Sequence, residues 1–261
     1  MAIRDTPFAP GTPCWVDLMT SDIEKAKSFY TALLGWTYDD SGPEYGDYSI
    51  ASKDGRSVAG LMPNSTENGM PDVWTTYVAT AAVEDSVGAA VAAGATVFMP
   101  ATAVGEFGRM SMLADSTGGV VGLWEAGSHT GFQRYNEPGS VTWDEYHSKD
   151  FAASTTFYET VFGWTWDVTG DSDDFRYSTA NVNGDVVAGM MDSAAFLPAE
   201  TPSHWTVYFS VENADDTIAT AVKLGATVLR GPEDTPFGRI ADLLDVTGAN
   251  FKLHQVLEGN G

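Results

Sequence analysis

Residues 15–38 read WVDLMTSDIEKAKSFYTALLGWTY, and residues 143–166 read WDEYHSKDFAASTTFYETVFGWTW. The two stretches share a leading tryptophan, an aspartate before an apolar run, a Phe-Tyr pair and a closing Gly-Trp-Thr, all at the same spacing. Self-similarity at one fixed period indicates an internal duplication, which decides the architecture before any single motif does. The chain of 261 residues is therefore predicted to consist of two related halves.

A finer pattern recurs twice within each half. A short strand leads to a polar cap, an amphipathic helix and a helix-ending glycine, and about three short strands with turn residues follow. Asp22 is expected to cap the first helix, because an aspartate accepts hydrogen bonds from the free N–H groups of a first turn. The helix-ending glycines are Gly35, Gly94, Gly163 and Gly225. The sequence thus predicts an α+β fold of four βαβββ units.

The stretch between the halves has no apolar period and carries turn residues throughout. We interpret residues 126–140 as a linker, residues 1–125 as the first domain and residues 141–261 as the second. His129, which lies in this linker, is expected to be exposed to solvent.

Composition excludes several classes of partner. The formal net charge is −23, from 36 acidic and 13 basic residues, so the chain should repel nucleic acids and anionic membranes. No apolar run approaches the roughly 18 residues that a membrane span needs. The N-terminus shows no apolar signal region, and we expect an acidic, cytoplasmic protein. The single cysteine, Cys14, excludes an internal disulfide and is predicted to be a small buried side chain.

Four βαβββ units in two pairs, with Phe-Tyr and Gly-Trp at the odd helices and Asp-x-Thr-Gly before the last strand, resemble the vicinal oxygen chelate superfamily. That group includes glyoxalase I, bleomycin-resistance proteins and extradiol dioxygenases. The pattern GTPxWVDL at residues 11–18 is similar to actinobacterial two-domain glyoxalase-like proteins described as hydroxylases or culture-filtrate antigens. The resemblance implies that each half forms a half-open, curved mixed sheet that encloses a cup.

The resemblance also implies where a metal would be held, because metal-using members place His, Gln or Glu at four inward positions. These positions fall on Trp15, Gly60, Thr75 and Gly122 in the first half, and on Trp143, Gly189, Thr206 and Lys252 in the second. Divalent metals need carboxylate, imidazole or thiolate ligands, and none of these residues provides one. We therefore expect no metal and no other cofactor, with a relocated site from Glu145, His204 and His254 as the alternative.

If the positions that the resemblance implies face inward, strand alternation extends them to the side chains that line each cup. The first cup would contain Trp15, Asp17, Thr75, Tyr77 and Trp124; the second would contain Trp143, Glu145, His147, His204, Thr206, Tyr208, Lys252 and His254. Aromatic walls with a few polar groups are typical of a small-molecule site and suit flat ligands. The alternative is that the aromatic side chains are ordinary core.

Three residues are candidates for acid–base catalysis. Asp17 and Glu145 occupy matching places two residues after the tryptophans, and a carboxylate beside an indole loses solvation, which raises its pKa toward that of a general base. His204 is the third candidate. Alternatively, the carboxylates only bind backbone groups or Arg109 and Arg239. Those arginines either pair across the domain interface or hold an anionic or carbonyl ligand at the mouth of the pocket.

The sequence favours a metal-independent protein that binds a small aromatic or polyketide-like molecule, either to act on it or to sequester it, in antibiotic biosynthesis or resistance. One alternative is an acid–base enzyme, such as a lyase, isomerase, cyclase or hydroxylase-like protein, that uses Glu145, His204 or Asp17. Another is a metal-dependent glyoxalase or dioxygenase with relocated ligands. The second cup is richer in polar groups and is the favoured site. The chain is expected to be a monomer or a homodimer.

Overall fold

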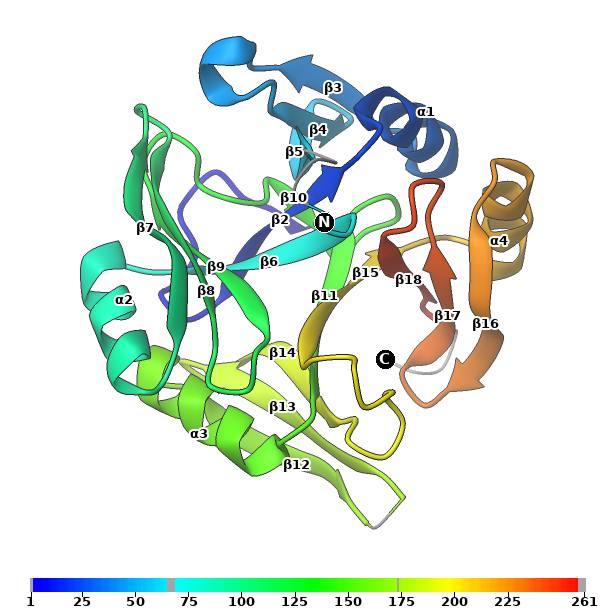
Figure 1. The fold of residues 1–261 in the computed structure, drawn as a ribbon. Coiled ribbons are helices and arrows are strands. Elements are labelled where there is room, and N and C mark those ends of the chain that lie inside the picture. Colours follow the sequence, from blue (N-terminus) through cyan, green and yellow to red (C-terminus); the bar gives the residue numbers. More distant parts are fainter. Residues whose placement is uncertain (1, 65–68, 173, 258–261) are drawn as a thin grey trace.

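Two curved sheets, each of eight strands, dominate the computed structural model, which describes residues 2–64, 69–172 and 174–257 (Figure 1). The first sheet contains β2 (Pro13–Thr20), β3 (Thr37–Asp40), β4 (Ser49–Lys53), β5 (Arg56–Pro63), β6 (Val73–Ala79), β7 (Thr96–Val104), β8 (Gly108–Ala114) and β9 (Val120–Ala126). The second contains β11 (Val141–Ser148), β12 (Thr165–Asp171), β13 (Arg176–Val182), β14 (Asp185–Asp192), β15 (His204–Ser210), β16 (Thr227–Thr235), β17 (Gly238–Leu244) and β18 (Asn250–Gln255).

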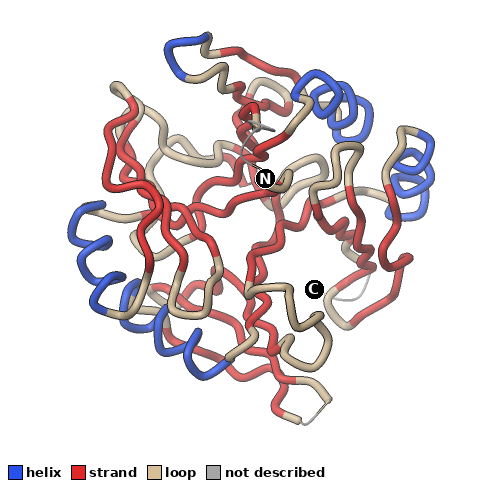
Figure 2. Tube along the Cα trace, in the orientation of Figure 1, coloured by secondary structure: helices blue, strands red, loops and turns tan. Residues whose placement is uncertain are grey.

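The helices lie around the outside of the sheets, as Figure 2 shows. They are α1 (Ile23–Leu34), α2 (Val83–Ala92), α3 (Phe151–Phe162) and α4 (Ala214–Lys223), with a short 3₁₀ helix η1 (Pro43–Tyr45). Two short strands, β1 (Ala2–Ile3) and β10 (Arg134–Tyr135), pair the N-terminal segment with the connection between the halves. Among the described residues, no helix combines the length and the apolarity that a membrane crossing would need.

The two sheets have matching strand orders, β3-β4-β5-β2-β6-β9-β8-β7 and β12-β13-β14-β11-β15-β18-β17-β16. In the first, β2 and β6 are antiparallel neighbours at the centre, while β5 runs parallel to β2 and β9 runs parallel to β6. The second sheet repeats these pairings. Each sheet therefore consists of two βαβββ units side by side, which confirms the predicted fold class.

Contacts between distant strands show that the sheets curl into cups. In the second sheet, the ring of Tyr177 on β13 lies 6.4 Å from that of Phe237, which follows β16 at the opposite edge. In the first sheet, Tyr45 of η1 and Phe107, which follows β7, lie 5.3 Å apart. A flat sheet could not bring these aromatic rings together, so each sheet folds around an interior face.

The predicted caps explain where the odd helices begin and end. The Asp22 side chain accepts a hydrogen bond from the backbone N–H of Lys25, and Asp150 does the same for Ala153. Gly35 and its counterpart at the end of α3 have left-handed backbone angles, which glycine adopts without steric cost. The repeated sequence therefore fixes these local structures in both halves.

The hydrophobic core is shared between the halves. Helix α1 contacts α4, and α2 contacts α3, so each helix of the first half packs against one of the second (Figure 1). Cys14 is buried as predicted, and burial raises the pKa of its thiol. The fully buried Trp36 and Trp164 donate their indole N–H groups to the carbonyls of Gly139 (2.7 Å) and Gly11 (2.6 Å), so both side chains belong to the core.

Candidate functional site

Four of the predicted residues form one polar network in the second cup. Lys252 Nζ on β18 donates hydrogen bonds to Glu145 Oε1 (2.9 Å) and to the hydroxyl of Tyr208 (2.8 Å), which in turn donates to Glu145 Oε1 (2.7 Å). His147 Nε2 lies 2.9 Å from the same carboxylate oxygen and 3.2 Å from Lys252 Nζ. The network is almost entirely buried, since Glu145 is only 5% exposed and Lys252 only 9%.

Strand register explains why these residues meet. Strands β15 and β18 run in parallel with Tyr208 opposite Lys252, and the antiparallel β11 places Glu145 opposite Thr206. Successive side chains of a strand point to opposite faces, so the residues at alternate positions share the interior face of the curved sheet. Thr206 is buried on this face, as predicted.

The electrostatics of the network differ from the sequence prediction for Glu145. Burial raises the pKa of this carboxyl, but the charge of Lys252 and the hydrogen bonds from His147 and Tyr208 outweigh burial and hold it well below its usual range. Burial and the neighbouring Glu145 raise the pKa of Tyr208 well above its usual value. Glu145 is therefore an ionised partner of Lys252 rather than a carboxyl with a raised pKa, and Tyr208 keeps its proton.

Aromatic side chains surround the network. The indole N–H of Trp143 donates to the hydroxyl of Tyr177 (3.0 Å), and the Tyr177 ring stacks on Phe175 at 6.0 Å. His147 and His204 stack with their ring planes 12° apart, and burial lowers the pKa of His204. The second cup thus combines a charged pair with flat ring faces.

Tyr177 and its counterpart Tyr48 were missed by the sequence analysis. A Cβ atom on Gly189 would lie 1.9 Å from the Tyr177 hydroxyl, and one on Gly60 would lie 1.7 Å from that of Tyr48. These glycines, at positions where a metal ligand was sought, instead leave room for a tyrosine. The repeated Tyr-Ser-x-Ala at residues 48–51 and 177–180 is the signal that could have found both.

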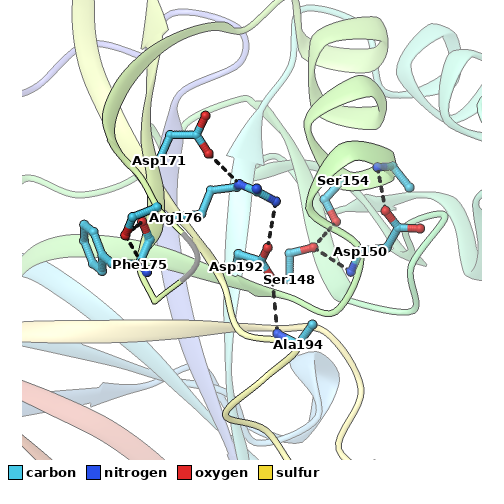
Figure 3. Close-up of polar contacts among 10 residues, drawn as sticks. Ser148, Asp150, Ser154, Asp171, Phe175, Arg176, Asp192 and Ala194 are labelled. Atoms are coloured by element: carbon cyan, nitrogen blue, oxygen red, sulfur yellow. Dashed lines mark hydrogen bonds and ion pairs between the residues drawn. The ribbon is translucent and has the colours of Figure 1, made fainter.

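Figure 3 shows how the hairpin that carries Tyr177 is fixed. Arg176 pairs with Asp171 at 2.9 Å and with Asp192 at 3.2 Å, which ties β13 to both of its neighbours. Ser148, at the end of β11, bonds to Ser154 of α3 at 2.7 Å. These contacts hold the strand ends from which the cup residues project.

His254 lies at the edge of the second cup. Its Nε2 bonds to the carbonyl of Phe237 (2.7 Å), and its Nδ1 is buried without a hydrogen-bond partner. His204 Nδ1 bonds to the carbonyl of Pro202 (3.0 Å). The predicted alternative, in which Glu145, His204 and His254 hold a metal together, does not form: over the described ranges no three His, Cys, Asp or Glu side chains come together as a metal site.

The first cup contains a different network around Asp17. This carboxyl is 4% exposed and hydrogen-bonds to Tyr77 and Tyr48, while Trp15 Nε1 donates to the Tyr48 hydroxyl at 2.8 Å. Burial raises the pKa of Asp17 to about 7, as the sequence analysis expected for a carboxyl beside an indole. Thr75, on the same face, is half-buried.

The segment after β9 fills the first cup, contrary to expectation. The His129 ring lies edge-on to Trp15 at 4.4 Å and to Trp124 at 5.4 Å, and Trp124 Nε1 donates to the His129 carbonyl at 2.9 Å. Burial lowers the pKa of His129 to about 4. The prediction of an exposed linker histidine was wrong, because the His129 backbone N–H bonds to the Phe107 carbonyl and turns the chain back over the cup.

Comparisons with known proteins agree with this geometry. The family model described as the Glyoxalase/Bleomycin resistance protein/Dioxygenase superfamily matches residues 14–146 and 141–253. The chain belongs to this superfamily. It is 40% identical over 255 residues to the Mycobacterium bovis protein named "Putative glyoxylase CFP32", with 96% of this chain and 97% of that protein covered.

The "Anthracycline biosynthesis protein DauV" of Streptomyces sp. (strain C5) is 35% identical over 267 residues, with 97% of this chain and 96% of that protein covered. Among solved structures, the Mn(II)-bound glyoxalase from Novosphingobium aromaticivorans is similar with a TM-score of 0.65 at 16% identity, covering 95% of this chain and 83% of that one. The 2,2′,3-trihydroxybiphenyl 1,2-dioxygenase from Sphingomonas wittichii has a TM-score of 0.63 at 13% identity, covering 95% and 91%. These structural similarities show the superfamily fold.

The residues of this member do not fit a metal ion at the centre of the second cup. The Lys252 ammonium lies there, within hydrogen-bond distance of Glu145, Tyr208 and His147. A divalent cation at this place would be repelled by the Lys252 ammonium. The network offers one carboxylate, Glu145, and one imidazole, His147, and both are already bonded to Lys252. In the first cup, a side chain at Gly122 would collide with the Tyr77 ring, since a Cβ would lie 2.1 Å from it.

The paired arginines do not bind the cup carboxylates or cross the domain interface. Arg109 forms an ion pair with Glu84 in the first turn of α2, and Arg239 pairs with Asp215 in the first turn of α4 at 3.0 Å. The prediction of an inter-domain pair was wrong, because each arginine meets an acidic residue of its own half. Both pairs are largely exposed to solvent, where an ion pair adds little to stability.

A separate cavity of about 500 Å³ lies between the N-terminal segment, the connection after β10 and the second sheet. Its lining includes Arg4, Tyr135 and Asp144. Asp144 accepts a hydrogen bond from Thr76 of the first sheet at 2.7 Å, and burial raises its pKa to about 7. Trp143 also contributes to its lining, whereas Glu145, Lys252 and Asp17 do not.

Proposed function

We propose that this chain binds a flat, aromatic, polyketide-like metabolite in its second cup without the aid of a metal ion. The observation that carries the proposal is the buried Glu145–Lys252 ion pair in a cup walled by Trp143 and Tyr177. Aromatic walls favour a planar ligand through stacking, while a charged pair fixes the orientation of its polar groups.

The comparisons support a polycyclic aromatic ligand. Two Streptomyces relatives of similar length are named for anthracycline biosynthesis, and anthracyclines contain fused aromatic rings. Each match covers 97% of this chain and 96% of the relative, so it includes both cups.

The proposed roles follow from position. Residues that line the second cup and would contact the ligand are Trp143, Glu145, His147, His204, Thr206, Tyr208, Lys252 and His254. In the first cup, Trp15 and Trp124 contact His129 instead, and Tyr77 hydrogen-bonds to Asp17. We assign the first cup a supporting role, and Arg109 and Arg239 the role of ion-pair partners for the acidic first turns of α2 and α4.

One observation favours acid–base enzymology as a second candidate function. Asp17 has a pKa of about 7, which is well matched to proton transfer near neutral pH. However, His129 covers the cup that contains it, so a substrate would have to displace that segment. Glu145 is ionised and bound by three donors, which makes it a weak base. Binding in the second cup is therefore the favoured function.

The experiment is a titration with 1,4-dihydroxyanthraquinone, followed by quenching of tryptophan fluorescence. Trp143→Ala should weaken binding about tenfold, because it removes a stacking face worth roughly 1 to 1.5 kcal/mol. Trp36→Phe, in the buried core, is the matched control and should leave affinity unchanged. Absence of quenching by any polycyclic aromatic compound, or equal affinity of Trp143→Ala, would contradict the proposal.

Product analysis separates binding from catalysis. Mass spectrometry of the bound compound after long incubation should recover it unchanged if the protein sequesters its ligand, and altered if it is an enzyme. A cytoplasmic location and a monomeric or homodimeric state stay predictions of the sequence. Light scattering of the purified chain tests the latter.

A further inference from the structure

Among the matched positions at which the two cups differ are Lys252 and Gly122. Lys252 lies opposite Tyr208 in the register of the second sheet, and Gly122 lies opposite Tyr77 in the register of the first. Each pair neighbours a carboxylate at the centre of its sheet. The duplication therefore provides an internal comparison of the same site with and without a cation.

The cup with the lysine and the cup without it differ in the pKa of their central carboxyl groups. In the first cup, burial outweighs the hydrogen bonds from Tyr77 and Tyr48 and raises the pKa of Asp17 to about 7. In the second, the charge of Lys252 helps to hold the pKa of Glu145 well below its usual range. The second cup consequently holds a buried lysine paired with an ionised carboxylate, and the first cup has no counterpart to this pair.

Lys252 Nζ has three protein partners, and one tautomer of His147 leaves the third N–H for a ligand. Glu145 Oε1 and the Tyr208 hydroxyl accept two of its three hydrogens. The third partner, His147 Nε2, is the most distant at 3.2 Å and has its own acceptor in Glu145 Oε1 at 2.9 Å. When His147 Nε2 donates to Glu145, its Nδ1 can accept a hydrogen bond from the Ser193 hydroxyl, 2.9 Å away. In that arrangement His147 does not accept from Lys252, so the third N–H of Lys252 has no protein acceptor.

Other charged and titratable groups surround the ammonium on every neighbouring strand. They are Glu145 and His147 on β11, Tyr177 on β13, His204 and Tyr208 on β15, and Asp242 on β17, opposite Lys252. Asp242 accepts a hydrogen bond from Asn250, and Glu145 accepts three from the network. Both carboxylates are thus already bonded to protein donors, while the ammonium has a hydrogen to offer.

We propose that the Lys252 ammonium is the fixed cation of the second cup and binds an ionised oxygen of the ligand, a phenolate or enolate beside a ring carbonyl. The inference rests on the proposed function and names the chemical class of its ligand. A phenol that binds in this way loses its proton to water, and the oxygen left behind accepts the third N–H of Lys252. Trp143 and Tyr177 stack on the ring system to which the oxygen is attached. The ammonium thereby supplies the positive charge that a metal ion would otherwise supply, in a cup whose residues do not fit a metal ion.

The test uses 1,2-dihydroxyanthraquinone, whose absorbance changes when its phenol ionises. With saturating protein, the midpoint of this change should shift to lower pH by about one unit, a tenfold preference for the phenolate. Lys252→Met should abolish the shift, whereas Lys252→Arg should retain most of it. Lys223→Met, which removes an exposed lysine of α4, is the matched control and should keep the full shift.

A second variant guards against misfolding, since Lys252→Met leaves Glu145 buried without its partner, which is strongly destabilising. The double variant Glu145→Gln/Lys252→Met removes both charges and should fold, bind the probe by stacking and show no shift. Wild-type protein that binds the probe as the neutral phenol, or a shift that persists in the double variant, would overturn this inference and leave the proposed function intact. Failure of wild-type protein to bind the probe at any pH would instead contradict the proposed function.

Discussion

The hydroxyl of Tyr30 lies 2.9 Å from a carboxylate oxygen of Asp245, although the two residues belong to different halves of the duplicated chain. Trp74 Nε1 donates to the same hydroxyl at 3.0 Å. The same arrangement occurs with the halves exchanged: Tyr158 of the second half donates to Asp115 of the first at 3.1 Å. The Phe-Tyr of each half is therefore bound to the Asp-x-Thr-Gly turn of the other, and the repeated signatures join the two domains.

Tyr30→Phe should destabilise the protein by about 1 to 3 kcal/mol, because it removes the buried partner of Asp245 Oδ2 and of the Trp74 N–H. Tyr158→Phe should have a similar effect by the same reasoning. Urea denaturation measures the change. Tyr38→Phe, which removes only a partly buried bond to the carbonyl of Lys27, is the control and should cost less. Equal effects of the two substitutions would contradict the special role of the inter-domain bond.

Stability should fall as pH rises from about 4 to about 7, in part because of Asp17. Burial raises the pKa of this carboxyl from 3.8 to about 7, so between these values the folded state binds a proton that the unfolded state has lost. The contribution is complete below about 4 and is lost as pH passes 7. Over this window it amounts to roughly 4 kcal/mol.

Asp17→Asn should flatten that pH dependence, with the urea midpoint followed at several pH values between 4 and 8. Asp144, whose pKa burial also raises to about 7, keeps part of the slope in this variant. Asp22→Asn, at an exposed helix cap, is the matched control and should leave the slope unchanged. An identical slope in Asp17→Asn and wild type would show that Asp17 is not buried in its acid form.

His129→Ala should destabilise the protein by about 2 kcal/mol and change its tryptophan fluorescence, because the ring packs between two indoles of the first cup. Ser128→Ala, at the exposed neighbouring position, should affect neither property. Fluorescence that is unchanged in His129→Ala would mean that the segment does not fill the cup.

Lys252→Glu should create a site for a divalent cation, since it replaces the ammonium with a third ligand beside Glu145 and His147. Addition of MnCl₂ should raise the melting temperature of this variant and leave that of wild-type protein unchanged. Lys223→Glu introduces the same charge on the surface and serves as the control. A rise in wild-type protein would show that Lys252 does not exclude the metal.

The sequence by itself determined the features that depend on local chemistry and on period. The duplication, the aspartate caps and the left-handed glycines follow from short-range patterns. Strand alternation extended the inward positions that the family resemblance implies to Glu145 and Tyr208. Such features need no knowledge of which strands meet.

Only the tertiary structure decided the partners. Arg109 pairs with Glu84 of its own half, and His129 packs in the first cup because the chain turns back over that cup. The matched carboxyls Asp17 and Glu145 have opposite pKa shifts, because their states depend on whether a lysine from a distant strand lies beside them. Desolvation can be guessed from one strand, but a Coulomb interaction requires the position of its partner, and that position is set by the curvature and register of the whole sheet.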